Sequence, residues 1–164
     1  MNDGPVLVLN AGSSSLKFTV YQRMTAAGGE AVLAGQIEGI GTAPRYTARN
    51  AAREKVADEA LDGTVNDARG ALAALAQKLR AHFGNTHVLG VGHRVVHGGA
   101  KYRQATRVTP QLIDVLRALA PLAPLHQPHN LAAIEAVAEG LAGTPQVACF
   151  DTSFHRGQPA VAEL

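Results

Sequence analysis

The segment from Asn10 to Lys17 (NAGSSSLK) combines small residues, hydroxyl groups and one cation, a composition typical of a turn. Between two strands, its backbone N–H groups and hydroxyls can surround a phosphate group. Lys17 follows Ser15 by two residues, so on a strand both side chains point to one face and the lysine adds positive charge there. The GxxxxGK[ST] spacing of a P-loop is absent. Two interpretations stay open: a phosphate-binding turn, or a hairpin that needs Gly and Ser only for its sharp bend.

A second motif runs from Gly92 to Gly99 (GHRVVHGG). Arg94 follows an apolar strand and precedes two valines, so we expect it to be partly buried and to have an anionic partner. That partner is either a carboxylate in a structural ion pair or a bound carboxylate or phosphate ligand. His93 and His97 lie four residues apart with no nearby Cys or acidic ligand, which argues against a zinc site.

Two further residues carry weaker signals. Asp151 follows a predicted strand, where a carboxylate can hold magnesium or orient groups in phosphoryl transfer, although an Asp there can equally form a turn. His126 lies in the Pro-rich segment 120–130 (APLAPLHQPHN), and is either a surface histidine or part of a site.

The elements that must position these residues are predicted from periodicity. Short apolar or alternating runs indicate strands at 6–9, 15–21, 31–40, 88–91 and 146–150. Residues 45–62 are ambiguous, because their Ala and Glu content favours a helix while the register near Arg45 favours a strand.

Three helices are predicted between these strands. The first begins after Thr64 as N-cap and stops at Gly84, the second opens at Thr109-Pro110, and the third carries an apolar stripe of Leu131, Ile134, Val137, Ala138 and Leu141. The pattern predicts a mixed sheet covered by helices, an α/β fold. Ligands of such sheets bind beyond the carboxyl ends of strands, where the polar segments described above fall.

Composition limits the classes of partner. The 164 residues are 46% hydrophobic, enough for one domain with its own core. Fifteen Lys and Arg against thirteen Asp and Glu give a net charge of +2, which argues against nucleic acid or an anionic membrane as partner. Cys149, the single cysteine, excludes an intramolecular disulfide and is expected to be a small core residue. With no signal-peptide pattern and no apolar run of membrane-spanning length, we expect a soluble, cytoplasmic protein.

Taken together, the motifs resemble those of the acetate kinase family. Asn10–Lys17 and Gly92–Gly99 are similar to its two signature motifs, and Ala123-Pro-Leu-His126 and Phe150-Asp-Thr-Ser-Phe-His155 match it in order and spacing. The resemblance runs from Val6 to Ala162. It implies an actin-like ATPase (ribonuclease H-like) α/β fold and a two-domain enzyme with a nucleotide between its domains. Residues 1–164 would be the N-terminal domain, with the C-terminal domain absent from this chain.

The resemblance also implies a role for each site residue. On the nucleotide side, Asn10 would help to hold Mg²⁺, while Ser13, Ser15 and Lys17 would bind the phosphates of ATP or ADP.

On the acceptor side, Arg94 would bind the acetate carboxylate and steady the transferring phosphoryl group. Val96 and Leu125 would line the pocket for the methyl group, and His126 would support the transferring phosphate. Asp151 would be the essential acid. Because acetate is already deprotonated at neutral pH, we expect Asp151 to act through magnesium or by orientation, without abstracting a proton.

The implied activity is reversible, Mg-dependent phosphoryl transfer between ATP and acetate, giving acetyl phosphate and ADP, in a homodimeric parent enzyme. The alternatives are a propionate kinase, a non-catalytic phosphate-binding half-domain, and a purely structural domain. In the family the missing portion supplies the adenosine pocket and further phosphate and magnesium ligands. We therefore expect the 164-residue chain to be inactive by itself.

Overall fold

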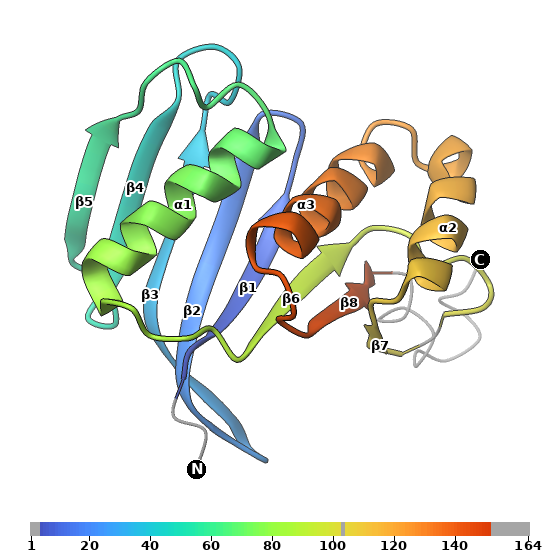
Figure 1. Cartoon of the computed structure of the whole chain (residues 1–164), viewed down its shortest axis with the longest axis horizontal. Coiled ribbons are helices and arrows are strands. Elements are labelled where there is room, and N and C mark those ends of the chain that lie inside the picture. The colour runs from blue at the N-terminus through green and yellow to red at the C-terminus, as the bar shows by residue number, and fades with distance from the viewer. Residues whose placement is uncertain (1–3, 103, 152–164) are drawn as a thin grey trace, which may run out of the picture.

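A single mixed sheet organises the molecule, as a computed structural model describing residues 4–102 and 104–151 shows (Figure 1). Eight strands lie in the order β5-β4-β3-β2-β1-β6-β8-β7. Their bounds are β1 Val6–Ala11, β2 Ser15–Thr25, β3 Gly28–Glu38, β4 Arg45–Asn50, β5 Lys55–Ala60, β6 Gly90–Val95, β7 Thr106–Arg107 and β8 Gln146–Phe150. The helices are α1 Ala68–Phe83, α2 Pro110–Ala118 and α3 Gln127–Gly140, with a 3-10 turn η1 Ala120–Leu122. The predicted α/β class is confirmed.

The first five strands form an antiparallel meander in chain order. On β2, Leu16, Phe18 and Val20 are buried, as their alternation predicts. The ambiguous segment 45–62 forms β4 and β5. Tyr46 and Ala48 of β4 are buried, so β4 shows the period-2 burial of a strand with one face on a core.

The other half of the sheet is parallel where the motifs lie. β6 pairs with β1 and β8 pairs with β6, both in parallel, so the carboxyl ends of these three strands meet at one edge. β6 begins at Gly90, two residues later than predicted, and extends through Arg94 to Val95. The short edge strand β7, antiparallel to β8, was not predicted.

Helix α1 begins later than the sequence suggested. The predicted N-cap Thr64 is wrong, because the Asp62 carboxylate accepts hydrogen bonds from the backbone N–H of Thr64, at 2.9 Å, and from its hydroxyl. The cap is Asp67, whose side chain accepts from the Gly70 N–H at 2.8 Å. Gly84 ends the helix as predicted, with a φ of 69° that favours glycine.

The next two helices lead to the site. α2 starts after Thr109, whose hydroxyl accepts from the Leu112 N–H at 3.2 Å, as predicted. α3 starts at Gln127, inside the segment expected to be a loop. Leu131, Ile134 and Val137 of its predicted stripe are buried, but Ala138 is exposed.

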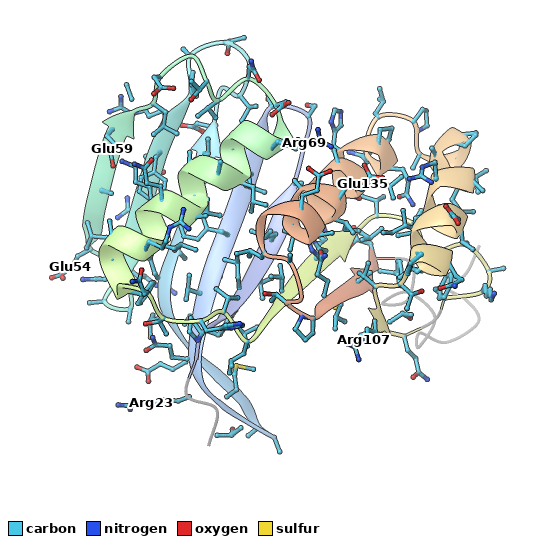
Figure 2. The ribbon with its side chains drawn as sticks, in the orientation of Figure 1. Arg23, Glu54, Glu59, Arg69, Arg107 and Glu135 are labelled. Atoms are coloured by element: carbon cyan, nitrogen blue, oxygen red, sulfur yellow. The ribbon has the colours of Figure 1, made fainter. Side chains whose placement is uncertain are left out.

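Among the described residues, charged side chains are spread over the surface without a basic concentration. Figure 2 shows Arg23 near the end of the β2–β3 hairpin, Arg107 on β7 and Glu59 on β5, far from one another. Two of the basic residues of β4 and β5 are paired with an acid, since Arg45 and Lys55 both contact Asp58 at 2.7 Å. Within the described ranges, no helix has the length and hydropathy needed to cross a membrane.

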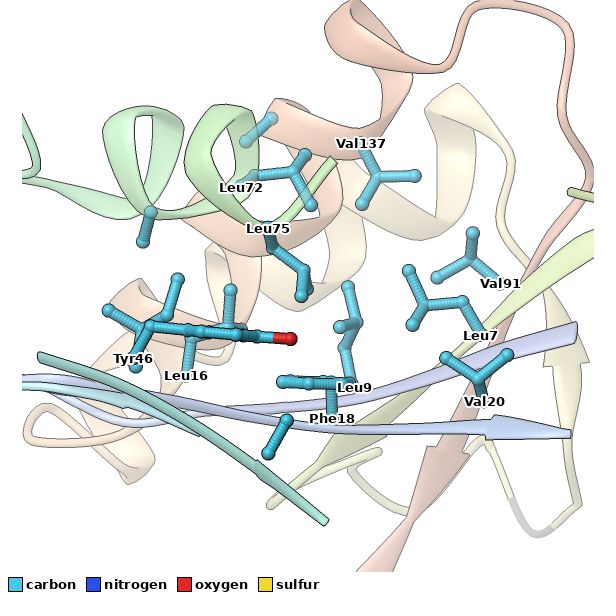
Figure 3. Packing of buried hydrophobic residues seen from close by; sticks show 14 of the residues in the cluster. Leu7, Leu9, Leu16, Phe18, Val20, Tyr46, Leu72, Leu75, Val91 and Val137 are labelled. Atoms are coloured by element: carbon cyan, nitrogen blue, oxygen red, sulfur yellow. The ribbon is translucent and has the colours of Figure 1, made fainter. Parts of the chain in front are cut away.

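The core lies between the sheet and its helices. Figure 3 shows Leu9, Phe18 and Val20 from the strands facing Leu72 and Leu75 of α1 and Val137 of α3. A second cluster joins α2 and α3 to β6 and β8 around Val95, Leu116, Ile134 and Phe150. The alternate strand residues, among them Val8 and Val147, are exposed on the opposite side. We call this side, on which no described helix packs, the helix-free face.

Candidate functional site

A row of chemically active side chains crosses the helix-free face near the carboxyl ends of the parallel strands. Lys17 on β2 is the Cα partner of Asn10 on β1, and Arg94 on β6 is the partner of Cys149 on β8. Leu9 and His93 are paired between β1 and β6, so the residues that follow them, Asn10 and Arg94, start from neighbouring positions. Neighbouring strands lie about 4.8 Å apart, which separates Lys17 and Arg94 by about two strand spacings. This row brings two cations and an amide to one face.

Arg94 is bound by Asp151 through a two-pronged ion pair. Its Nε donates to Oδ1 at 2.9 Å and to Oδ2 at 3.1 Å, and its Nη2 donates to Oδ2 at 2.7 Å. The hydrogen bonds to the carboxylate raise the pKa of Arg94 above its usual value. Arg94 is more exposed than the sequence suggested, with side-chain exposures of 53% for Arg94 and 34% for Asp151. The pair is therefore accessible to a dissolved anion or cation.

The turn between β1 and β2 is held in shape by its own backbone. The Gly12 N–H donates to Ser15 O at 2.8 Å, and the Ile40 N–H, two residues after β3, donates to Ser14 O at 3.1 Å. Ser13 is exposed and Ser15 is half-buried. This leaves the Ser13 side chain exposed at the rim of the sheet, and Ser15 lies two positions before Lys17 on β2.

A cavity of about 260 Å³ opens behind this turn, on the helix side. Its polar lining comes from three elements: the turn itself, the residues before α1, and the first turn of α3. These polar residues are Ser13, Ser15, Asn66, Asp67 and His129. Sequence reasoning did not connect residues 66–67 or His129 with the turn, because they are distant from it in the chain.

The proposed acceptor-side residues lie on two segments. Val96 follows β6 directly and is half-buried. Leu125 is 76% exposed, and His126 is an exposed residue at the N-cap position of α3 whose side chain makes no cap hydrogen bond. The described residues join Arg94 to Asp151 directly, but no hydrogen bond or ion pair within them links the His126 side chain to either. The Thr152–His155 part of the last motif lies outside the described residues.

Cys149 was expected in the core, and the structure overturns this. It lies on the helix-free face beside Arg94 and is exposed, while its neighbours Ala148 and Phe150 are buried. All four residues 147–150 are apolar, so the sequence does not show that alternate residues of this strand are exposed to solvent on one face of the sheet.

Sequence reasoning also missed two buried amides in the first turn of α3. Asn130 accepts from the Val96 N–H at 3.1 Å and donates to Ala11 O at 3.0 Å. Gln127 donates to His97 O at 3.1 Å and to Leu116 O at 3.3 Å. Both belong to the helix start that was expected to be a loop. An uncharged polar pair inside an amphipathic pattern could have signalled them, since buried amides need partners.

His93 is a buried core residue whose ring contacts the Gln146 side chain. It is 3% exposed, and the Gln146 side-chain amide lies 2.7 Å from its Nε2. With the amide nitrogen facing the ring, Gln146 donates to His93 and to the Ile134 carbonyl. Burial lowers the pKa of His93 to about 4, so the ring is neutral at neutral pH.

The described residues offer oxygen atoms for a hard cation but no protein-only cage. Among residues 4–102 and 104–151, no three or more His, Cys, Asp or Glu side chains gather as a metal site. Asn10 and Asp151 present oxygen ligands near the carboxyl edge, and each carboxylate oxygen can accept more than the Arg94 hydrogen bonds. Magnesium usually combines one or two carboxylates with waters and substrate phosphates, so this donor set fits it.

Comparison with known proteins gives one consistent result. The model of the Acetokinase family matches residues 5–164. An acetate kinase of Rhodopseudomonas palustris is 44% identical over 159 residues, covering 96% of this chain and 39% of the relative. A propionate kinase of Enterobacter is 40% identical over 151 residues, covering 92% of this chain and 35% of the relative.

Among solved structures, that of Porphyromonas gingivalis acetate kinase superposes with a TM-score of 0.83 at 32% identity. The superposed part covers 95% of this chain and 39% of the Porphyromonas gingivalis protein. The chain thus spans about two fifths of the length of the relatives it matches.

Proposed function

Because the chain belongs to the acetokinase family, with an actin-like α/β fold, we propose that it is the N-terminal part of a two-domain acetate kinase. We call that enzyme the parent enzyme. It would transfer a phosphoryl group between ATP and acetate, and residues 1–164 would supply half of its active site. The observation that carries the proposal is the row Lys17, Asn10 and Arg94 on the helix-free face, with Asp151 bound to Arg94.

On the nucleotide side, Ser13, Ser15 and Lys17 would bind the phosphates. The turn offers hydroxyls and backbone N–H groups, and Lys17 adds a mobile point charge from the adjoining strand. Anion binding by such a turn is electrostatic, so we expect it to weaken as salt increases.

On the acceptor side, Arg94 would bind the carboxylate. Its planar guanidinium matches a carboxylate or a phosphoryl group through two parallel hydrogen bonds. Asp151 occupies Nε and Nη2, so it fixes the plane in which the rest of the guanidinium meets the substrate. Val96 and Leu125 would surround the methyl group, and His126 would donate to a phosphoryl oxygen.

Asn10 and Asp151 would hold magnesium through their side-chain oxygens, because both lie at the edge where the phosphates would lie. When bound, the ion supplies positive charge that neutralises the phosphate oxygens. The residues of this chain then have three tasks: to orient the phosphates, to hold the carboxylate, and to offset negative charge along the reaction axis.

The proposed step needs no general base. A carboxylate oxygen of acetate forms a bond to the γ-phosphorus, the bond from that phosphorus to the bridging oxygen breaks, and ADP leaves with the bonding electrons. Acetate enters as the anion at neutral pH, so no proton has to be removed. Asp151 would therefore act by holding the ion and by fixing the plane of the Arg94 guanidinium.

A second candidate is propionate transfer, which the likeness to a propionate kinase favours. One methylene in an apolar pocket is worth about 1–3 kcal/mol, so a modest difference near Val96 and Leu125 decides between the two acids. The isolated chain is a further case: it spans two fifths of its relatives, so we propose that it binds phosphate without turnover. The homodimer and the cytoplasmic location stay predictions from the family resemblance.

The test is acyl phosphate formation, trapped with hydroxylamine, from ATP, magnesium and acetate, propionate or butyrate. It is run on the parent enzyme and on the 164-residue chain of verified mass. We expect acetate to be the best acceptor for the parent enzyme and no turnover by the chain. A parent enzyme inactive with all three acids would contradict the proposed function.

A further inference from the structure

Strands β1 and β6 part at the point where the site begins. Their parallel pairing ends at Leu9 and His93. Beyond it, β1 continues to Ala11 paired with Leu16 of β2, and β6 continues to Val95 paired with Phe150 of β8. Each strand thus keeps its outer neighbour while the ladder between the two stops.

Asn130 closes the gap between the two strands. Its Oδ1 accepts from the Val96 N–H at 3.1 Å, and its Nδ2 donates to Ala11 O at 3.0 Å. One donor and one acceptor are what a peptide unit of a neighbouring strand supplies, so the amide replaces a missing rung of the ladder. Asn130 is 3% exposed as a residue and belongs to α3, which is anchored by Leu131 and Ile134 in the core.

The two bridged atoms belong to the two halves of the site. Ala11 follows Asn10 and opens the turn that carries Ser13 and Ser15, whereas Val96 lies two residues after Arg94. Gln127, one turn earlier on α3, holds His97 O but does not reach β1. In the described part of the chain, Asn130 is the side chain that hydrogen-bonds to both segments.

We propose that Asn130 is a positioning residue that sets the distance between the phosphate turn and Arg94. This inference rests on the proposed function, in which the turn holds the nucleotide phosphates and Arg94 holds the acceptor. Asn130 is buried on the helix side and acts through the backbones of Ala11 and Val96. Without the Asn130 side chain, the phosphate turn and Arg94 can each still bind their ligand, but the distance between the two ligands is no longer fixed. The rate of the chemical step should therefore fall more than the binding affinities.

The experiment compares Asn130→Ala with Gln146→Ala in the parent enzyme. Gln146 is a matched control, because it is also a buried amide between α3 and the sheet but contacts His93 and not the two site segments. Asn130→Asp is a second, less disruptive variant: its carboxylate can accept from Val96 but, while ionised, cannot donate to Ala11 O. A protonated Asp restores both bonds, so acidification should recover part of the activity of Asn130→Asp.

We expect kcat per folded enzyme to fall about 100-fold in Asn130→Ala, with each KM within about threefold of wild type. Gln146→Ala should keep kcat within about threefold. An Asn130→Ala kcat within about twofold of wild type, or a loss equal to that of Gln146→Ala, overturns the proposal. If Asn130→Ala does not fold, an Asn130→Asp enzyme with wild-type kcat at all pH values overturns it equally.

A second readout does not depend on turnover. In the 164-residue chain, amide hydrogen exchange reports the bridge at the Val96 N–H and the turn at the Gly12 and Ile40 N–H groups. Asn130→Ala should raise exchange at all three by about tenfold or more relative to Gln146→Ala. Equal exchange in the two variants overturns the bridge. A wild-type parent enzyme without kinase activity overturns the proposed function, while this readout still decides on the bridge.

Discussion

The Asp151 carboxylate accepts hydrogen bonds from Nε and Nη2 of Arg94 at donor–acceptor distances of 2.7–3.1 Å, while both side chains remain accessible to solvent. An ion pair this exposed contributes little to folding, typically less than about 1 kcal/mol. Its two-pronged geometry is nevertheless specific, because it fixes the plane of the guanidinium at the end of the row formed by Lys17, Asn10 and Arg94. The pair is therefore suited to orientation more than to stability.

Removing either partner should separate activity from stability. We expect Arg94→Ala and Asp151→Ala to lower the free energy of unfolding by less than about 1 kcal/mol, because the pair is exposed. The same variants should lower kcat/KM of the parent enzyme at least about 100-fold. Urea unfolding and steady-state kinetics measure the two effects. A purely structural pair would give loss of stability with nearly full activity in the folded fraction.

Alkylation of Cys149 should block the site. The thiol is exposed and lies on the strand position paired with Arg94, so a bulky maleimide there would occupy the space above the guanidinium. We expect N-ethylmaleimide to inactivate the parent enzyme and ATP with acetate to slow the inactivation. Cys149→Ser is the control and should resist the reagent. Equal inactivation of wild type and Cys149→Ser would show that this thiol is not near bound substrate.

Val96 should control acceptor size. It directly follows β6 and is half-buried, and we propose that it lines the methyl pocket. Val96→Ala removes two methyl groups from that wall, so the ratio of kcat/KM for propionate over acetate should rise about 10-fold or more. The measurement is the acyl phosphate assay with each acid in turn. The exposed Val147→Ala, on β8, serves as control, and an unchanged ratio in Val96→Ala would exclude Val96 from the pocket.

Stability should fall in mild acid because of His93. In the folded chain its pKa is about 4, whereas in the unfolded chain the ring takes up a proton near 6.5. Between these values the unfolded state binds more protons, so stability is complete above about pH 6.5 and decreases as the pH falls toward 4. From about pH 7 to about pH 5 the loss should be about 2 kcal/mol. Urea unfolding of His93→Leu should lack this part of the pH dependence, and an equal dependence in both chains would contradict it.

The sequence predicted the central strands because their signals are local. The apolar run from Val6 to Leu9 predicts a strand, and the alternation around Phe18 predicts both a strand and which of its faces is buried. The segment 45–62 could not be assigned, because strand formation there depends on pairing with β3, about ten residues away in the chain, and local propensity does not include that pairing. The prediction of Thr64 as the N-cap was wrong because its hydroxyl donates a hydrogen bond to the carboxylate of Asp62, two residues earlier.

The site was predicted less completely than the fold. The motifs gave Asn10, Lys17 and Arg94 as candidates, but their arrangement in one row follows from strand pairing that spans more than 80 residues. Asn130 and Gln127 were missed because their partners are backbone groups of residues far away in the chain, so the sequence does not show what the two amides bind. Cys149 was misplaced because only the observed sheet reveals which face of β8 is open.

The most direct test of the account is the hydroxylamine-trapped acyl phosphate formed from ATP and acetate by Arg94→Ala, measured beside Arg107→Ala. Arg107 is also an exposed arginine at the edge of the sheet, where it is the partner of Val147. Arg107→Ala therefore removes the same charge at a position outside the row. We predict that Arg94→Ala loses at least about 100-fold in kcat/KM for acetate, while Arg107→Ala stays within about threefold of wild type. Equal activity in the two variants would contradict the assignment of Arg94 as the acceptor-binding group.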